Sequence, residues 1–127
     1  MQPYPPLINR LPMLITSWNI RGCRSTLKTH LLRRQIELEK LVVLFLQETK
    51  CSESNLRSIG GKSWKGCEVV AVDAIKAAGG IGILWNPREV LLYKFSTTQY
   101  SLLAAFHIIG TNIRGFLTNV YSPPRAE

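Results

Sequence analysis

The chain has 127 residues, of which 46% are hydrophobic and 19% charged, and its formal net charge is +8. This composition excludes an intrinsically disordered chain and is typical of one globular domain with a buried core. The positive charge favours polyanionic partners such as nucleic acids or phosphorylated ligands. The alternative is a solvated basic helix face that has no partner.

The start of the chain predicts a leader rather than a targeting segment. Four prolines fall within residues 1–12, which predicts an unstructured leader there and one domain over residues 13–127. Prolines also interrupt the apolar core of a signal peptide, and no apolar run reaches transmembrane length. We therefore expect an intracellular, nuclear protein that is not secreted and has no membrane partner. The three cysteines, Cys23, Cys51 and Cys67, predict reduced thiols.

A strand, a helix and a second strand are predicted in the first part of the domain. Residues 13–18 are rich in strand formers, and residues 26–40 carry Leu27, Leu31, Ile36 and Leu38 at near-helical spacing. The apolar residues of 41–46 are consecutive, which is typical of a strand buried on both faces. A right-handed crossover makes the two strands parallel, so Asn19 and Glu48, each just past a strand end, should lie close together.

The later segments have a different rhythm. Residues 52–60 predict a short capped helix, and five apolar segments follow that are separated by turn residues. Antiparallel strands and hairpins are expected there, which gives a mixed α/β arrangement of helices on a sheet on a sheet. The five predicted strands are 67–74, 79–85, 89–95, 100–109 and 115–121.

Few residues point to chemistry. The chain has no P-loop, no HExxH motif and no nucleophile with an obvious base, and His30 and His107 are expected to be a surface and a core histidine. Asn19 and Glu48 remain, at the strand ends where α/β sheets usually build sites. A fixed carboxylate suits Mg²⁺, and a neighbouring amide can orient a phosphate oxygen. The alternative is that both are only the polar ends of strands.

Four short motifs occur along the chain: WNIRG at 18–22, LQETK at 46–50, GGIGILW at 79–85 and NVYSPP at 119–124. In this order and separation they resemble the endonuclease/exonuclease/phosphatase superfamily, which includes apurinic endonucleases and DNase I. They are most similar to the endonuclease domains of plant LINE-type retrotransposons. The resemblance runs from residue 13 to residue 124, and the four motifs in register make it specific although each one alone is weak.

The resemblance implies a function and roles for individual residues. It implies a phosphodiesterase that cuts DNA with a divalent metal, Mg²⁺ or Mn²⁺, held by Glu48, while Asn19 and Tyr121 belong to the catalytic site and Tyr121 contacts the scissile phosphate. Trp18, Gln47, Gly79 and Gly80 match the motifs as scaffold. The residues expected to bind the nucleic-acid backbone are Arg21, Lys28, Arg33 and Arg34.

The sequence also departs from the family pattern. The implied fold is the N-terminal half of a four-layer α/β/β/α sandwich with a mixed sheet, because the Asp-x-Asn and Asp-His pairs of the second half have no counterpart and Asp73 is the sole aspartate. We therefore expect little or no activity from this chain alone. The alternative is a catalytically dead, basic nucleic-acid-binding fragment. Apolar strands left uncovered predict self-association through an exposed sheet.

Overall fold

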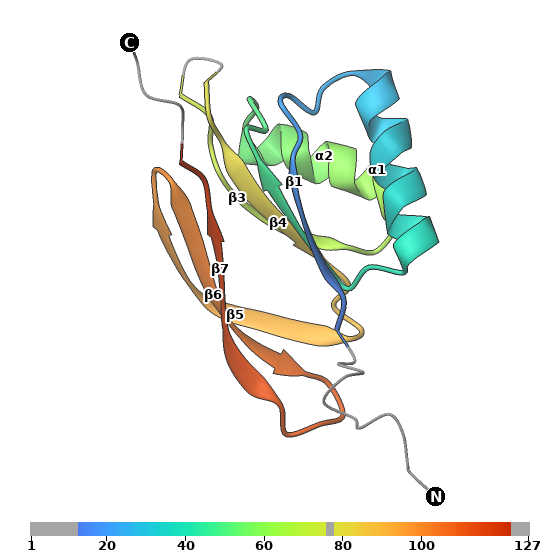
Figure 1. Cartoon of the computed structure of the whole chain (residues 1–127), viewed down its shortest axis with the longest axis vertical. Helices are drawn as coiled ribbons and strands as arrows, with labels where there is room; N and C mark the ends of the chain where they lie inside the picture. The colour runs from blue at the N-terminus through green and yellow to red at the C-terminus, as the bar shows by residue number, and fades with distance from the viewer. Residues whose placement is uncertain (1–12, 76–77, 123–127) are drawn as a thin grey trace, which may run out of the picture.

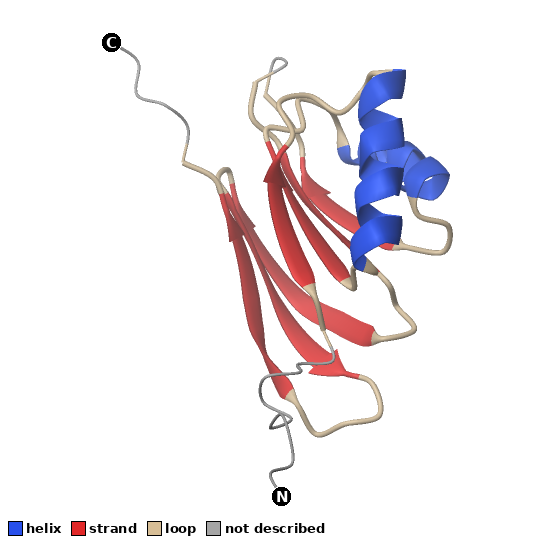
Figure 2. Ribbon diagram, turned by 45° about the vertical axis from the view of Figure 1, so that its right-hand side comes forward, coloured by secondary structure: helices blue, strands red, loops and turns tan. Residues whose placement is uncertain are grey.

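The computed structural model describes residues 13–75 and 78–122, and the predicted leader lies outside them. Two helices cover one face of a four-stranded sheet, and a three-stranded sheet packs on its other face (Figures 1 and 2). The predicted layering of helices on sheet on sheet is confirmed. The elements in chain order are β1 (Ile15–Asn19), α1 (Thr26–Glu39), β2 (Val43–Gln47), α2 (Glu53–Ser63), β3 (Glu68–Val72), β4 (Ile81–Trp85), β5 (Val90–Thr98), β6 (Ser101–Ile108) and β7 (Arg114–Val120).

The first three elements form the predicted βαβ unit. Strands β1 and β2 pair in parallel with Ile15 opposite Val43 and Asn19 opposite Gln47. Helix α1 begins where Ser25 accepts a hydrogen bond of 3.1 Å from the backbone N–H of Lys28, and it ends at Lys40, which takes the left-handed conformation. The carboxyl ends of β1 and β2 therefore lie side by side, as the crossover predicts.

The packed face of α1 differs from the predicted one. Leu32 and Ile36 are buried, whereas Leu27, Leu31 and Leu38 are exposed. Residues four apart lie above one another on a helix, so Leu32 and Ile36 form a single stripe that meets the sheet. The predicted stripe mixed residues from two sides of the helix, and only its Ile36 faces the core.

The five later strands do not form one meander. Strand β4 pairs antiparallel with β2 and β3, so the first sheet has the order β1-β2-β4-β3, while β5, β6 and β7 form a separate antiparallel sheet. All five residues of β4 are buried because it lies in the middle of the molecule. Gly82 of β4 has no space for a side chain, since a Cβ there would lie 2.3 Å from Leu56 of α2.

Two apolar cores hold the three layers together. One lies between the helices and the first sheet, around Leu32, Leu44 and Leu56. The other lies between the two sheets, around Val43, Ile83 and Leu102. The opposite face of the second sheet is open in the part of the chain that the structure describes, and Leu91, Phe116 and Val120 are exposed. Neither described helix is long and apolar enough to cross a membrane.

Candidate functional site

The structure brings Asn19 and Glu48 to the same end of the first sheet. Asn19 is the exposed last residue of β1, and it pairs with Gln47 of β2. Glu48 directly follows Gln47. The chain continues as a pair of loops, because the N–H of Ile20 bonds the carbonyl of Gln47 at 3.0 Å and that of Gly22 bonds the carbonyl of Glu48 at 2.7 Å. Glu48 has a φ of 52°, so the strand stops at this residue and its side chain is re-aimed.

Tyr121 reaches the same place from the other sheet. It follows β7, and its N–H bonds the carbonyl of Tyr100 at 2.9 Å in the β5–β6 turn. The pKa of Tyr121 is raised above the usual value for tyrosine, first by burial and then by the negative charge of Glu48 and a hydrogen bond with it, while Arg21 acts in the opposite direction. The phenol therefore stays neutral, with its hydroxyl group beside a carboxylate.

A buried polar network joins the two sheets directly behind this site. The side-chain N–H₂ of Gln47 donates to the side-chain oxygen of Asn119 at 2.7 Å and to the hydroxyl of Ser17 at 2.8 Å. Asn119, which is fully buried, donates in turn to the carbonyls of Leu46 at 3.1 Å and Gly82 at 2.8 Å. The network connects strands β1, β2, β4 and β7. It thereby fixes the position of β7 relative to the first sheet, with Tyr121 beside Glu48.

Sequence reasoning assigned Gln47 to the scaffold and missed Asn119. One signal was present, because strand alternation puts Asn119 on the same face as Leu117, and both are buried. An amide on a core-facing position must find partners inside the protein. The sequence did not indicate those partners, which come from strands β2 and β4.

The glycine pair of the third motif supports the loop that follows Glu48. The N–H of Thr49 bonds the carbonyl of Gly80 at 3.1 Å, and the N–H of Lys50 bonds the carbonyl of Gly79 at 2.8 Å. Gly80 has a φ of +90°, and a Cβ on it would lie 2.4 Å from the hydroxyl of Thr49. The close backbone approach requires glycine at this position.

The basic residues predicted to bind nucleic acid lie in different surroundings. Arg21 is exposed, and its positive charge acts to lower the pKa of Tyr121. The Lys28 ammonium donates to the carbonyls of Ile20 and Gly22, the latter at 3.1 Å, so it holds the loop after β1. Arg33 donates to the carbonyl of Lys62 at 2.6 Å and ties α1 to α2.

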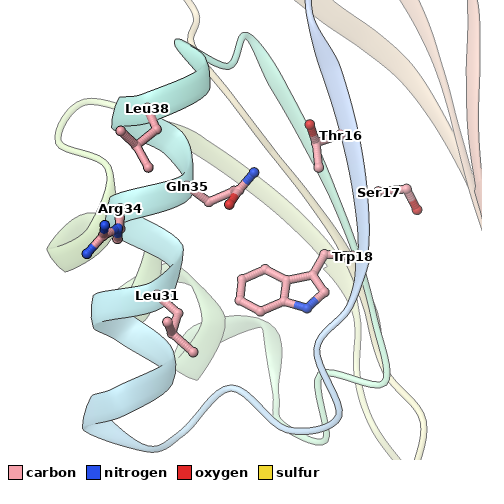
Figure 3. A pocket seen from close by; sticks show the side chains of 7 residues that line it. All are labelled: Thr16, Ser17, Trp18, Leu31, Arg34, Gln35 and Leu38. Atoms are coloured by element: carbon pink, nitrogen blue, oxygen red, sulfur yellow. The ribbon is translucent and has the colours of Figure 1, made fainter.

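Arg34 lines a groove of about 460 Å³ between α1 and β1 (Figure 3). The indole of Trp18 points from β1 into this groove, toward Leu31 and Gln35, while Ser17 points away from the helix. Asn19, Glu48 and Tyr121 do not line the groove. It therefore lies apart from the strand ends where the motifs meet.

The two histidines play no part in the site. His30 is exposed on α1, and His107 shares a hydrogen bond of 2.7 Å with the carbonyl of Thr111 in the β6–β7 turn. A ring that bonds its own turn stabilises the hairpin.

The ability of the site to hold a metal rests on few donors. Within residues 13–75 and 78–122, no group of three or more histidine, cysteine, aspartate or glutamate side chains lies together. Mg²⁺ needs fewer, since it binds through one or two carboxylates and keeps several waters. The carboxylate of Glu48, at the strand end next to that of Asn19, is of the kind that binds such a partly hydrated ion, and it does not form a full protein cage.

The fold is an α/β fold with a mixed sheet that matches about half of DNase I-like endonuclease/exonuclease/phosphatase structures. An AP endonuclease from Leishmania major superposes with a TM-score of 0.63 and 20% identity over 84% of this chain. The APE2 catalytic domain of Xenopus laevis superposes with a TM-score of 0.62 and 18% identity over 89% of this chain. An endonuclease/exonuclease/phosphatase family protein from Bacteroides thetaiotaomicron superposes with a TM-score of 0.65 and 10% identity over 84% of this chain. No protein-family model and no curated protein matches the sequence.

The chain spans less than half of the length of these three structures, namely 39%, 46% and 47% respectively. At such low identities the likeness defines the fold and leaves the activity open. The predicted half-sandwich is confirmed, and the resemblance to the superfamily holds at the level of structure.

Proposed function

We propose that this chain carries one half of a phosphodiesterase-type site, which binds a divalent cation weakly through Glu48 and holds the DNA backbone, with little or no hydrolysis of its own. One observation supports this most strongly. Asn19, Glu48 and Tyr121 come from two sheets and from distant parts of the sequence, yet their strands end at one place. Carboxyl ends of strands in open α/β sheets are the usual position of such sites.

Each residue has a role that its surroundings allow. Glu48 holds Mg²⁺ or Mn²⁺ with Asn19 beside it, and the neutral phenol of Tyr121 donates a hydrogen bond to a phosphate oxygen. The charge of Arg21 acts on this phenol, and Arg21 contacts the phosphate backbone as a fixed positive charge. A bound cation would act as a Lewis acid that neutralises charge on the phosphoryl group.

Slow hydrolysis follows from the donors that the chain supplies. In-line attack needs a base or a positioned residue for the water, as well as stabilisation of the leaving oxygen. The single aspartate of the chain, Asp73, accepts a hydrogen bond of 2.7 Å from the backbone of Glu53 at the start of α2. Asp73 is thereby engaged at the start of that helix and is not free to serve as this base.

Cation binding can be tested with Mn²⁺, whose electron paramagnetic resonance signal broadens when the ion binds protein. We expect the wild type to bind Mn²⁺ and Glu48→Gln to lose most of that binding. Glu89→Gln is the matched control because Glu89 is exposed beside Asn86, at the opposite end of the sheets. Equal binding by all three proteins would overturn the role of Glu48.

DNA binding and cleavage are tested separately. Fluorescence anisotropy with a labelled duplex should show binding that weakens as salt rises, by about 0.9 in logarithmic slope for each phosphate contact. In the same buffer with Mg²⁺, plasmid nicking should not exceed that of Glu48→Gln. Nicking by the wild type that Glu48→Gln abolishes would show an active enzyme. No binding at low salt would remove the nucleic-acid partner altogether.

The second candidate function is a catalytically dead domain that binds nucleic acid and no metal. This function has less support, because Lys28 and Arg33 already donate hydrogen bonds to backbone carbonyls of the protein. It predicts that DNA binding is the same with Mg²⁺ and with a chelator, whereas the half-site predicts tighter binding with Mg²⁺.

We further propose an origin in a plant LINE-type retrotransposon. The motifs at 18–22 and 46–50 support it, together with Arg21 at a position where many other relatives carry an acidic or amide residue. Many dispersed copies of this sequence in the source genome would agree with such an origin, and a single copy would contradict it.

A further inference from the structure

Two cysteines meet beneath the loops of the site. The sulfur atoms of Cys23 and Cys51 lie 3.3 Å apart, and both side chains are buried. The backbone joins the same loops, since the N–H of Cys23 bonds the carbonyl of Thr49 at 3.2 Å, and the Cys23 sulfur lies 3.4 Å from that carbonyl oxygen. Cys23 follows Asn19 by four residues and Cys51 follows Glu48 by three.

We propose that Cys23 and Cys51 form a peroxide-sensitive dithiol, which closes to a disulfide that links the two loops leaving β1 and β2. A disulfide has an S–S length of about 2.05 Å, so the two sulfurs must approach by about 1.2 Å. Rotation of the two side chains provides such a movement, and the backbone hydrogen bond from Cys23 to Thr49 already joins the two loops.

The two thiols of the pair differ in how readily they lose a proton. The pKa of Cys51 is lowered to about 7, mainly because the Cys23 thiol donates a hydrogen bond to the Cys51 thiolate, and also because Thr49 bonds it and Arg24 is near. The pKa of Cys23 is correspondingly raised, first by its bond to Cys51 and then by burial. Because Arg24 also favours a negative charge on Cys51, we expect Cys51 to be the attacking thiolate and Cys23 the resolving thiol.

The reaction balances with hydrogen peroxide as the oxidant, which is small enough for a buried site. The Cys51 thiolate attacks one peroxide oxygen, an S–O bond forms, the O–O bond breaks and hydroxide leaves. The Cys23 sulfur then attacks the Cys51 sulfenic acid, the S–S bond forms, the S–O bond breaks and water leaves with the proton of the Cys23 thiol. Two thiols and one peroxide become one disulfide and two waters, with two electrons passed to the peroxide.

Cys67 provides an internal control. It is the third free cysteine, and burial raises its pKa to about 11, so its thiolate is scarce at neutral pH. We expect Cys51 to react about tenfold faster than Cys67 or more.

Peptide mapping tests the proposal on the unmodified protein. After limited peroxide treatment and alkylation, trypsin without reductant should release residues 22–24 linked to residues 51–57, while Cys67 stays alkylated in its own peptide. The oxidised protein should melt higher by on the order of 10 °C, and dithiothreitol should reverse the shift. Free alkylated Cys23 and Cys51, earlier loss of Cys67, or links only between two molecules would overturn the proposal.

Three variants separate the roles of the cysteines. Cys23→Ala should leave Cys51 as a sulfenic acid that dimedone traps, and Cys67→Ala should form the disulfide as the wild type does. Dimedone labelling of Cys23 in Cys51→Ala at the wild-type rate would contradict the assignment of the attacking thiol. The peptide map of the wild type decides the disulfide itself, even if a variant fails to fold.

Discussion

Gln47 donates a hydrogen bond of 2.7 Å to Asn119 across the space between the two sheets. The two residues are 72 positions apart in the sequence. Each lies just before a residue of the candidate site, since Glu48 follows Gln47 and Tyr121 lies two residues after Asn119. A bond between buried amides is directional, unlike apolar contact, so it defines how one sheet sits on the other. We therefore expect the position of Tyr121 relative to Glu48 to depend on the hydrogen bond between Gln47 and Asn119.

Asn119→Ala should destabilise the protein by about 2–4 kcal/mol, because buried partners of the amide lose their hydrogen bonds. Gln47→Ala should be similar, and the double variant should show coupling of about 1 kcal/mol or more. Thr118→Ala, on the exposed side of β7, should cost less than about 1 kcal/mol. Urea unfolding of the four variants measures these differences, and strict additivity of the two core changes would show that the bond does not link the sheets.

Gly79→Ala and Gly80→Ala should differ although both glycines have positive φ. A Cβ on Gly79 meets nothing within 4 Å, so the variant bears only the backbone penalty of about 1 kcal/mol. A Cβ on Gly80 collides with the buried Thr49, which should raise the cost to about 3 kcal/mol. Adding Thr49→Ala to Gly80→Ala should recover part of the loss. Equal melting temperatures for the two glycine variants would contradict this explanation.

Lys28→Met should reduce stability more than it reduces DNA binding. The methionine keeps the apolar stem but cannot donate to the carbonyls of Ile20 and Gly22, which should cost about 1–2 kcal/mol. Lys65→Met is the control, since Lys65 is exposed and the change there should stay within about 0.5 kcal/mol. Thermal unfolding and anisotropy on the same samples separate the two effects. A large loss of DNA affinity at unchanged stability would return Lys28 to the binding surface.

Tyr121 should make the fold sensitive to alkaline pH. In the unfolded chain tyrosine loses its proton near pH 10, whereas the pKa of folded Tyr121 is raised. The raised pKa means that the folded state holds the proton more tightly, so this contribution to stability is complete below about pH 10 and is lost as the pH rises above it.

Phenolate absorbance in buffer with a chelator should show one tyrosine that titrates late, and Tyr121→Phe should remove that component. Glu48→Gln should bring it to lower pH, because the charge of Glu48 contributes to the shift, and the distant Glu89→Gln should not. A titration that Glu48→Gln leaves unchanged would show that burial alone raises the pKa.

The open face of the second sheet should cause self-association. Phe116 is 72% exposed, and Val120 and Leu91 are 61% and 51% exposed on the same sheet. Phe116→Lys should reduce association in sedimentation velocity with little change in stability. Leu38→Lys adds the same charge at an exposed leucine on the helical side and should have less effect. A wild type that stays monomeric at all concentrations would contradict the prediction.

The βαβ unit and the neighbouring strand ends that carry Asn19 and Glu48 could be predicted from the sequence alone. The signals were local: a run of consecutive apolar residues for β2, a capped helical segment before it, and the handedness of the crossover. It also identified the later strands, but grouped them as one meander. Hairpin signals report where a strand turns, and they do not say that β3 and β4 extend the first sheet while β5 to β7 form another.

Which distant side chains come together at the site follows from how the elements pack on one another. Tyr121 lies beside Glu48 and Asn119 bonds Gln47 because of the way the two sheets pack on each other. Cys23 meets Cys51 because the loops after β1 and β2 pack together. Lys28 looked like a surface cation in the sequence and proved to bind the loop after β1. Periodicity indicates an apolar face, although in α1 it selected the wrong stripe. Contacts between elements follow from the combined burial of all of them, which no single segment encodes.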